Sequence, residues 1–362
     1  MKKICVGVAI LCGIIFAYPA IAQELVPDKI TTAKAVVIEV LKQETKKIPG
    51  TDVDSINQTI SAKIIEGDEK GLLVTVPNDY LVLKVGEVFY LTHTVNTLDG
   101  SDWYQVSDPY RLPAVYFFVG LFVLCVLLVG GKQGIRGLLS LIGSLIVILY
   151  VLLPAIIHGY PPILVSIGVS SLIIIIGSYV THGFNRTTTS AVVGMITTII
   201  FTGVLAYVAV HATRLSGFNT EEAVYLNFNT HGKVDFAGLL LGGIMIGLLG
   251  VLYDVSIGQA VAVEELHNAA KHFSRREVFT RALRIGREHI GALVNTLAIA
   301  YVGASLPLLL LYYTSASDWH MTLNQEIFAT EIIRIMIGSI GLVLAVPITT
   351  ALSVLMLVKK ES

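Results

Sequence analysis

A carboxylate stands inside a long apolar stretch of this sequence. Asp254 lies within residues 237–263, where almost every other side chain is apolar or glycine. A charge in such a segment is costly, and it needs a hydrogen-bond donor, a cation or a proton. Polar side chains follow it within two helical turns and open the next apolar stretch. We therefore predict an intramembrane polar site, for a small solute or an ion, that consists of Asp254, Ser256, Gln259, Asn295 and Thr296.

Small residues accompany Asp254 at helical spacing. Gly243, Gly247, Gly250 and Gly258 are three or four residues apart from one another and from Asp254, so all five share one face of a helix. Small residues let two helices in a membrane approach closely. We therefore expect this face to pack against a neighbouring helix rather than against lipid.

A second pair of ionisable residues opens the last apolar stretch. Glu331 and Arg334 are three residues apart, a spacing that allows an ion pair on a helix. The sequence favours a clamp at the membrane boundary for this pair, with a functional role as the alternative. His158, His182 and His211 each stand at the end of an apolar stretch, and we interpret them as interfacial side chains rather than ligands.

Several kinds of chemistry are excluded by the motifs that this chain lacks. The segment from Glu264 to His267 is the nearest approach to a zinc-protease motif, and it lacks the first histidine. No phosphate-binding glycine loop and no second aspartate of an intramembrane protease occur. Cys5, Cys12 and Cys125 stand in apolar runs and predict neither a disulfide framework nor a zinc cluster. We predict no enzyme activity, no cofactor and no metal, and the net charge of −1 gives no reason to expect a nucleic-acid partner.

Apolar stretches of membrane length must position the predicted site. The chain is 54% hydrophobic and only 14% charged, with a mean hydropathy of +0.75. About 20 apolar residues suffice for a helix to cross a bilayer. From residue 112 onward we predict an α-helical integral membrane bundle, residues 112–358, with about seven transmembrane helices. They cover residues 112–131, 137–157, 161–180, 189–211, 237–260, 291–313 and 331–357.

The amino terminus reads as an export signal. Two lysines precede a short apolar run, and Ala20 and Ala22 offer the small residues that a signal peptidase accepts. We predict a cleaved signal peptide at residues 1–22, with an uncleaved anchor helix as the alternative.

Residues 23–111 have a different composition. They contain nine Lys and Arg and fourteen Asp and Glu, a net charge of −5. Short β-branched runs alternate with turn signals. We predict a small extracytoplasmic all-β domain, either an OB-like barrel or a sandwich. Its expected strands cover residues 33–41, 59–65, 71–76, 88–94 and 104–106.

Charge placement predicts the orientation of the spans. If residues 23–111 are exported, the cytoplasmic segments between spans and the residues after the last span carry eleven Lys and Arg, whereas the outside segments between spans carry only Arg214 and Lys233. Residues 264–290 form the one sizeable cytoplasmic loop, and they read as a basic helix beside the membrane. Lipid headgroups suffice as its partner; a partner protein or a gating role is the alternative. The carboxyl terminus is then on the cytoplasmic side of the membrane.

Long phrases of the carboxyl-terminal half identify a family. Residues 247–256 read GLLGVLYDVS, residues 284–290 read RIGREHI, and residues 294–310 read VNTLAIAYVGASLPLLL. These phrases resemble the YibE/F family of bacterial multi-span membrane proteins, over roughly residues 112–358. Members often have an acidic residue where Tyr253 stands, which argues against a carboxylate pair here. The resemblance implies a membrane bundle and no particular substrate.

Two functions fit these observations. One is a permease-like transporter of an unknown small solute or ion, which uses the site around Asp254. The other is a non-transporting assembly or sensory component, whose exported domain binds an envelope protein. The bilayer is the partner in both cases, and association into a homo-oligomer is compatible with either.

Overall fold

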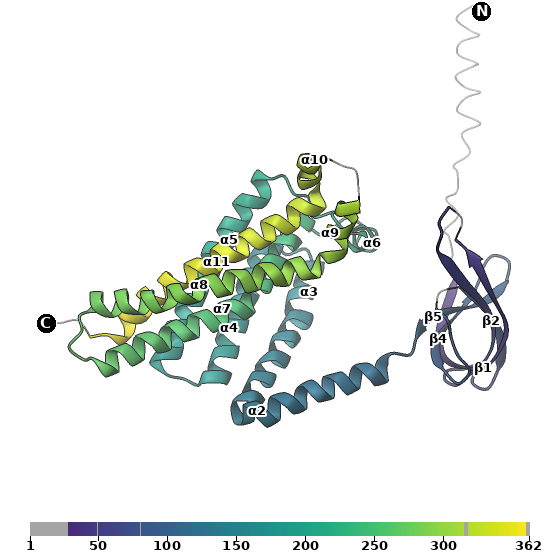
Figure 1. Cartoon of the computed structure of the whole chain (residues 1–362), viewed down its shortest axis with the longest axis horizontal. Helices are drawn as coiled ribbons and strands as arrows, with labels where there is room; N and C mark the ends of the chain where they lie inside the picture. The colour runs from purple at the N-terminus through teal and green to yellow at the C-terminus, as the bar shows by residue number, and fades with distance from the viewer. Residues whose placement is uncertain (1–27, 49, 80, 315–317, 360–362) are drawn as a thin grey trace, which may run out of the picture. The chain divides into compact units, whose positions relative to one another are not determined.

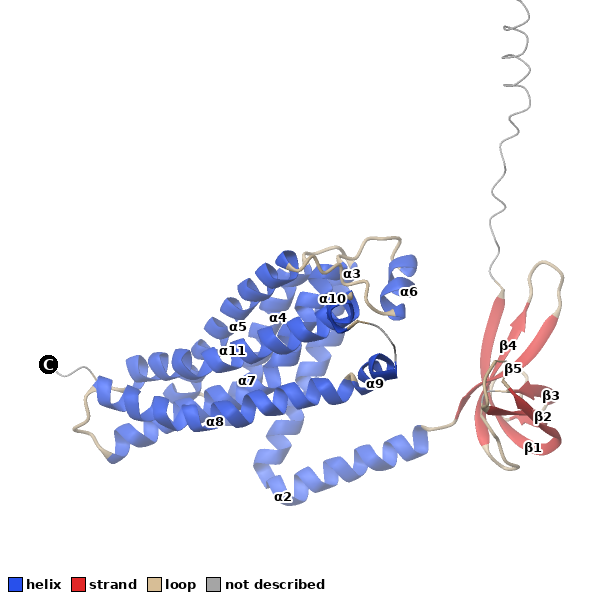
Figure 2. Cartoon of the chain, turned by 45° about the horizontal axis from the view of Figure 1, so that its top comes forward, coloured by secondary structure: helices blue, strands red, loops and turns tan. Residues whose placement is uncertain are grey.

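A computed structural model describes residues 28–48, 50–79, 81–314 and 318–359 of the chain. The expected signal peptide, residues 1–22, lies outside the described residues. The chain divides near residue 121 into two compact units. The first is built on a β-sheet, and the second is helical (Figures 1 and 2).

Five antiparallel strands form the first unit, in the order β3-β2-β1-β4-β5. The prediction of a small antiparallel sheet is therefore confirmed. β1 is the longest strand and pairs with both β2 and β4, while β3 and β5, the two edges, also lie close together. The strands are β1 (Lys29–Lys47), β2 (Asp54–Ile64), β3 (Leu73–Asn78), β4 (Val88–Val95) and β5 (Asp102–Pro109).

Alternation of apolar and polar residues builds the core of this unit. Ile60, Phe89 and Leu91 are at most 1% exposed. A buried amide, Gln58, adds a polar link: its Nε2 donates to the Leu83 carbonyl (3.0 Å) and its Oε1 accepts from the Leu83 amide (2.8 Å). Because every one of these groups is paired, the amide can be buried without a large penalty. It fixes the segment before β4 against β2.

The second unit consists of helices, most of them apolar. α11 packs against α5, α7 and α8, and α7 also packs against α4 and α5. The helices are α2 (Leu112–Val147), η1 (Ile148–Leu152), α3 (Leu153–Ile157), α4 (Pro162–His182), α5 (Arg186–Ala212), α6 (Glu221–Asn229), α7 (Phe236–Ala269), α8 (Arg275–Ala304), α9 (Leu306–Thr314), α10 (Trp319–Asn324) and α11 (Glu326–Leu357).

Within the described residues, five helices are long and apolar enough to cross a membrane, or six if α8 and α9 form one bent span. The first of them runs continuously from Leu112 to Ile157 and contains two of the predicted spans. Gly131 interrupts it with φ 51° and ψ −133°, a conformation that is open to glycine and strained for other residues. α8 and α9 meet at an angle of 65°, beside Pro307.

The basic segment 264–290 is mostly helical, as expected, but its helical parts belong to the ends of α7 and α8 rather than to a separate helix. α7 continues to Ala269 and α8 begins at Arg275, so only a short connection separates them. Ser274 starts α8 with a capping box: its hydroxyl accepts from the Glu277 amide, and the Glu277 carboxylate accepts from the Ser274 amide. The predicted sixth span, 291–313, likewise divides between the second half of α8 and α9.

Close helix contacts surround the middle of α7. Met195 and Ile199 of α5, Leu248 of α7 and Leu342 of α11 are at most 1% exposed and form one apolar cluster. Gly194 allows α5 to approach α11, because a Cβ atom at this position would lie 3.0 Å from the Cα of Thr349. α7 is thus held firmly on one side while it carries Asp254 on another.

Candidate functional site

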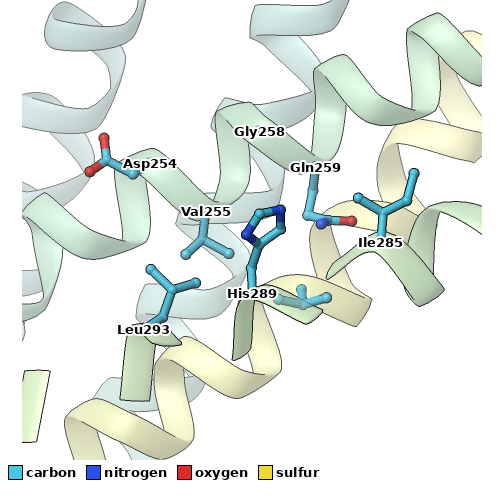
Figure 3. A pocket seen from close by; sticks show the side chains of 8 residues that line it. Asp254, Val255, Gly258, Gln259, Ile285, His289 and Leu293 are labelled. Carbon is cyan, nitrogen blue, oxygen red and sulfur yellow. The ribbon is translucent and has the colours of Figure 1, made fainter. Parts of the chain in front are cut away.

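Asp254 lies past the middle of α7, with its side chain exposed toward two cavities. The smaller cavity has a volume of about 260 Å³ and lies between α7, α8 and α11. Its wall includes Gln259, Ile285, His289 and Val346. Figure 3 shows His289 between Val255 and Gln259, and it shows the Asp254 carboxylate turned away from His289.

The larger cavity has a volume of about 710 Å³ and lies between α2, α4 and α7. Most of its wall is apolar, with Ser140 and Ser144 on α2 and His182 on α4 as polar groups. The His182 ring lies 5.9 Å from the Tyr253 ring, centroid to centroid. His182 also interacts electrostatically with Asp254. This size is in the range of small-molecule sites, with apolar walls and few polar groups.

The glycines that share a face of α7 with Asp254 mostly border open space rather than a packed helix. A Cβ atom at Gly243, Gly250 or Gly258 would meet no heavy atom within 4 Å. Gly250 lines the larger cavity, and Gly258 lines both. Gly247 is the exception, since it lies against the hydroxyl of Tyr301 on α8. The expectation of close packing along this face therefore holds only at Gly247; beside Asp254 the small residues leave space.

Ser256 and Gln259 are buried, and α11 supplies their partners. The Thr349 hydroxyl donates to Ser256 Oγ (3.2 Å). The Thr350 hydroxyl lies 2.8 Å from Gln259 Oε1 and 2.6 Å from the Val346 carbonyl. Ser256 is fully buried and Gln259 is 4% exposed. These two side chains therefore join α7 to α11, and of the two only Gln259 also lines a cavity.

The same polar seam continues onto α5. Ser190 Oγ lies 2.9 Å from Ser353 Oγ, one turn of α11 beyond Thr349. Both serines are fully buried. Hydrogen bonds between helices of this kind hold a membrane bundle in register, because lipid offers no competing partner. α5, α7 and α11 are thus joined by hydroxyl groups at the depth of the proposed site.

Asn295 and Thr296 are not brought to Asp254. Both side chains are exposed on α8, and neither lines either of the two cavities. The Thr296 hydroxyl donates to the Ala292 carbonyl of its own helix (2.8 Å). In their place α8 offers His289, which lines the smaller cavity.

Glu331 and Arg334 form the ion pair that their spacing predicts. The Arg334 Nη1 atom lies 3.0 Å from Glu331 Oε1, and both side chains are partly buried. The Arg334 guanidinium also lies over the Tyr301 ring, 5.9 Å from its centroid. Because Tyr301 reaches Gly247, the pair belongs to the contact between α7, α8 and α11. It does more than anchor one helix at an interface.

Two functional candidates, His182 and His289, are missing from the sequence-predicted site. His289 fell into the segment interpreted as a loop, although Ile285, His289 and Leu293 repeat every four residues and share one helical face. His182 was interpreted as interfacial because it ends an apolar stretch. Its position beside Tyr253 depends on how α4 packs against α7, which sequence spacing does not reveal.

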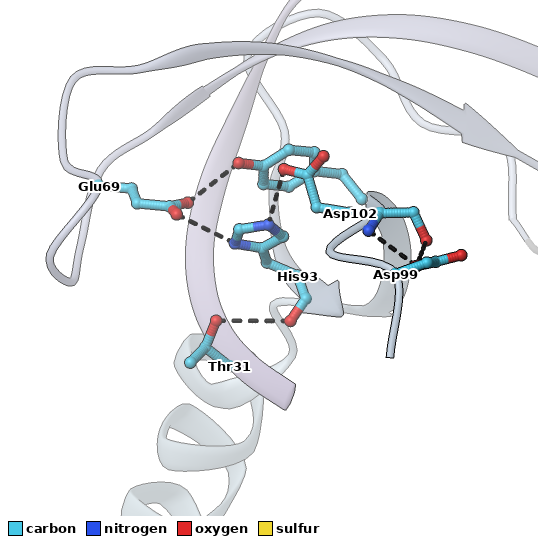
Figure 4. Close-up of polar contacts among 7 residues, drawn as sticks. Thr31, Glu69, His93, Asp99 and Asp102 are labelled. Atoms are coloured by element: carbon cyan, nitrogen blue, oxygen red, sulfur yellow. Dashed lines mark hydrogen bonds and ion pairs between the residues drawn. The ribbon is translucent and has the colours of Figure 1, made fainter. Parts of the chain in front are cut away.

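The β-unit has a polar cluster of its own. His93 on β4 lies between two carboxylates, with Nδ1 3.0 Å from Glu69 Oε1 and Nε2 3.2 Å from Asp102 Oδ2 (Figure 4). Its ring stacks on Tyr104 at 4.2 Å, and the Tyr104 hydroxyl donates to Glu69 Oε2 (3.3 Å). The cluster joins β4 and β5 to the connection between β2 and β3, which stabilises this end of the sheet.

Long apolar helices around a seam of hydroxyl groups, with one carboxylate beside two cavities, are compatible with a helical membrane protein that has a polar centre. The chain belongs to the YibE/F-like family: the family model described as YibE/F-like protein matches residues 118–359. This match confirms the resemblance of the carboxyl-terminal phrases. No curated protein and no solved structure matches the chain.

Proposed function

We propose that this protein is a permease of the bacterial cytoplasmic membrane, which moves a small solute or ion through a polar site around Asp254. The observation that supports the proposal is the position of Asp254, whose side chain lines cavities on two faces of one helix. An intramembrane carboxylate marks a substrate or ion pathway more often than a structural contact. Apolar walls with few polar groups suit a small solute.

Each side chain has a separate task in this proposal. Asp254 provides the negative charge that binds a cation or a proton. Gln259 and Ser256 position α7 against α11 through Thr350 and Thr349. Asn295 and Thr296 stay outside the proposed site, because they line neither cavity.

The proposed topology has seven spans. As a straight helix, the 46 residues from Leu112 to Ile157 would be about 69 Å long, more than twice the roughly 30 Å of a hydrocarbon core. The break at Gly131 supports a division into two spans. With α4, α5, α7, the α8–α9 pair and α11, the total is seven. The excess of Lys and Arg in alternate connections supports an exported β-unit and a cytoplasmic carboxyl terminus.

For the β-unit we propose an OB-like barrel. A strand order of β3-β2-β1-β4-β5, with both edges close to each other, supports closure of the sheet into a small barrel. Such barrels bind ligands on their strands and loops, which supports a sensing or docking role outside the membrane.

Transport is tested in liposomes that contain the purified full-length protein. Osmotic swelling would be followed with panels of amines, amino acids and sugars, and ion uptake with radiolabelled sodium and rubidium and with a trapped pH-sensitive dye. We expect flux of at least one probe, reduced at least tenfold in Asp254→Asn. Asp318→Asn, the same change on an exposed side chain before α10, is the matched control. Equal flux in wild type and Asp254→Asn would remove the site from the proposal.

A second function is favoured by the independence of the β-unit. This unit has its own apolar core, and residues 23–111 carry a net charge of −5, as expected of a domain that binds a partner in the envelope. Deletion of residues 23–108 separates the two functions in cells. A transporter should keep measurable flux, whereas an assembly or sensory component should lose all activity while the helical unit still inserts.

A further inference from the structure

The charges around Asp254 narrow the choice of ion, if the protein transports as proposed above. Among the described residues that line the two cavities there is no Lys, Arg or second carboxylate. Each cavity instead has one imidazole, His289 in the smaller and His182 in the larger. α2 contributes only hydroxyl groups as polar atoms, α11 contributes the apolar Val346, and α7 adds the phenol of Tyr253.

Asp254 shares one cavity with each of the two histidines. It interacts electrostatically with His182, and Figure 3 shows it turned away from His289. Gly250 and Gly258 lie one turn before and one turn after it, with open space at their Cβ positions. No side chain at these two positions of α7 therefore obstructs a rotamer change of Asp254. Exposed side chains change rotamer rapidly.

We infer that the ion handled at this site is a proton, which Asp254 exchanges with His182 in one cavity and with His289 in the other. An N–H bond of protonated His182 breaks as an O–H bond forms on the Asp254 carboxylate. After the carboxyl group rotates, its O–H bond breaks as an N–H bond forms on His289. The reverse sequence carries the proton in the other direction, and no other reactant is consumed.

The donor set suits a proton better than a metal cation. Hard cations such as Mg²⁺ and Ca²⁺ take six or more oxygen ligands. The basic groups that line the two cavities with Asp254 are imidazoles, which exchange protons in the physiological range. Within the described residues no group of three or more His, Cys, Asp or Glu side chains could hold a metal ion. The side chains of Gln259 and Ser256 are engaged with α11.

Infrared titration tests the exchange without any knowledge of the solute. The full-length protein in phosphatidylethanolamine and phosphatidylglycerol vesicles would be compared between about pH 5 and pH 8, the range in which imidazoles titrate. We expect a carboxylic acid band that disappears on alkalinisation and is missing in Asp254→Asn. In His182→Gln and in His289→Gln the midpoint of this band should move by about one pH unit, because each variant removes an ionisable group that shares a cavity with Asp254.

His158→Gln and His211→Gln are matched controls. Each of these histidines lies at a helix end with Nδ1 beside a carbonyl oxygen, and neither lines either cavity, so the midpoint should stay in place. If either His182→Gln or His289→Gln does not fold, the midpoint measured in the other variant tests the inference. An unchanged midpoint in the folded cavity variants, or a midpoint that depends on sodium concentration, overturns the inference.

Failure of this inference is distinguishable from failure of the transport proposal. Flux that is lost in Asp254→Asn, together with an unchanged titration in both histidine variants, refutes proton exchange and leaves transport intact. A titration coupled to both histidines, in vesicles that pass none of the probes, supports proton exchange at the site and refutes transport.

Discussion

At the scale of single residues, the site around Asp254 shows what linear spacing can and cannot predict. Asp254 itself was predictable as a candidate site, because a carboxylate in an apolar stretch is costly and marks a functional position. Ser256 was expected beside it, yet two positions on a helix are about 200° apart, and Ser256 points to α11 instead. His182 and His289 come from other helices, so only the packing of the bundle reveals them.

Tyr104 gives the β-unit a pH dependence whose sign can be worked out. Burial, and then the nearby Glu69 carboxylate, raise the pKa of Tyr104 above 10.0. A raised value favours the protonated form in the folded state, so this contribution to stability is present below pH 10.0 and is lost as the pH rises through the raised pKa. The pKa of Lys34 is also raised, by its hydrogen bond to Glu66, and acts in the same window.

We therefore expect the free energy of unfolding of the β-unit to fall as the pH rises above 10.0, and to fall less in Tyr104→Phe. The phenylalanine ring keeps the stack on His93 and lacks the ionisable hydroxyl; the part due to Lys34 remains. Urea unfolding followed by Trp103 fluorescence, in a Trp319→Phe background, measures the difference. The same alkaline loss in Tyr104→Phe as in the parent protein would contradict this assignment.

At the scale of secondary-structure elements, the strands were predictable and the helix connections were not. Alternating burial in β3, for example, follows the period of two that its sequence shows. The segment between Glu264 and Arg287 was expected to contain one basic helix beside the membrane. It is instead shared by the end of α7 and the start of α8, where the capping box at Ser274 begins the second helix. The angle between α8 and α9 depends on the break at Ser305 before Pro307.

A side chain at Gly194 should destabilise the contact between α5 and α11. In Gly194→Ala the new methyl group would press on the hydroxyl and the Cα of Thr349, so α5 and α11 must separate. Overpacking of this kind costs about 1–3 kcal/mol. Gly168→Ala is the matched control, because a Cβ atom on this α4 residue meets nothing within 4 Å.

Unfolding of both variants in mixed micelles with increasing dodecyl sulfate, followed by circular dichroism, provides the comparison. We expect an earlier transition for Gly194→Ala and an unchanged one for Gly168→Ala. Coincident transitions would mean that the contact between α5 and α11 adjusts without cost.

At the scale of the whole molecule, the number of crossings decides on which side each end of the chain lies. Seven spans place the β-unit outside and the carboxyl terminus in the cytoplasm, whereas six would place both on the same side. The seven-span topology depends on the break at Gly131. We expect an alkaline phosphatase fused after residue 108 to be active, and a green fluorescent protein fused after residue 362 to fluoresce.

A further fusion near Lys132 should give the cytoplasmic result, because the first span ends there. Phosphatase activity at that position would show that α2 crosses the membrane only once, and the proposed topology would have to be replaced.

Access of water to Asp254 is the most direct test of a polar transport site. Gly258 lines both cavities, so a cysteine there, in a protein without Cys5, Cys12 and Cys125, reports on them with a membrane-impermeant thiosulfonate reagent. Ile200→Cys, on an exposed apolar face of α5, is the comparison for a position in contact with lipid. We expect rapid modification of Gly258→Cys in vesicles opened to the reagent on both sides, and almost none of Ile200→Cys. Equal resistance of the two cysteines would contradict a water-accessible site at Asp254.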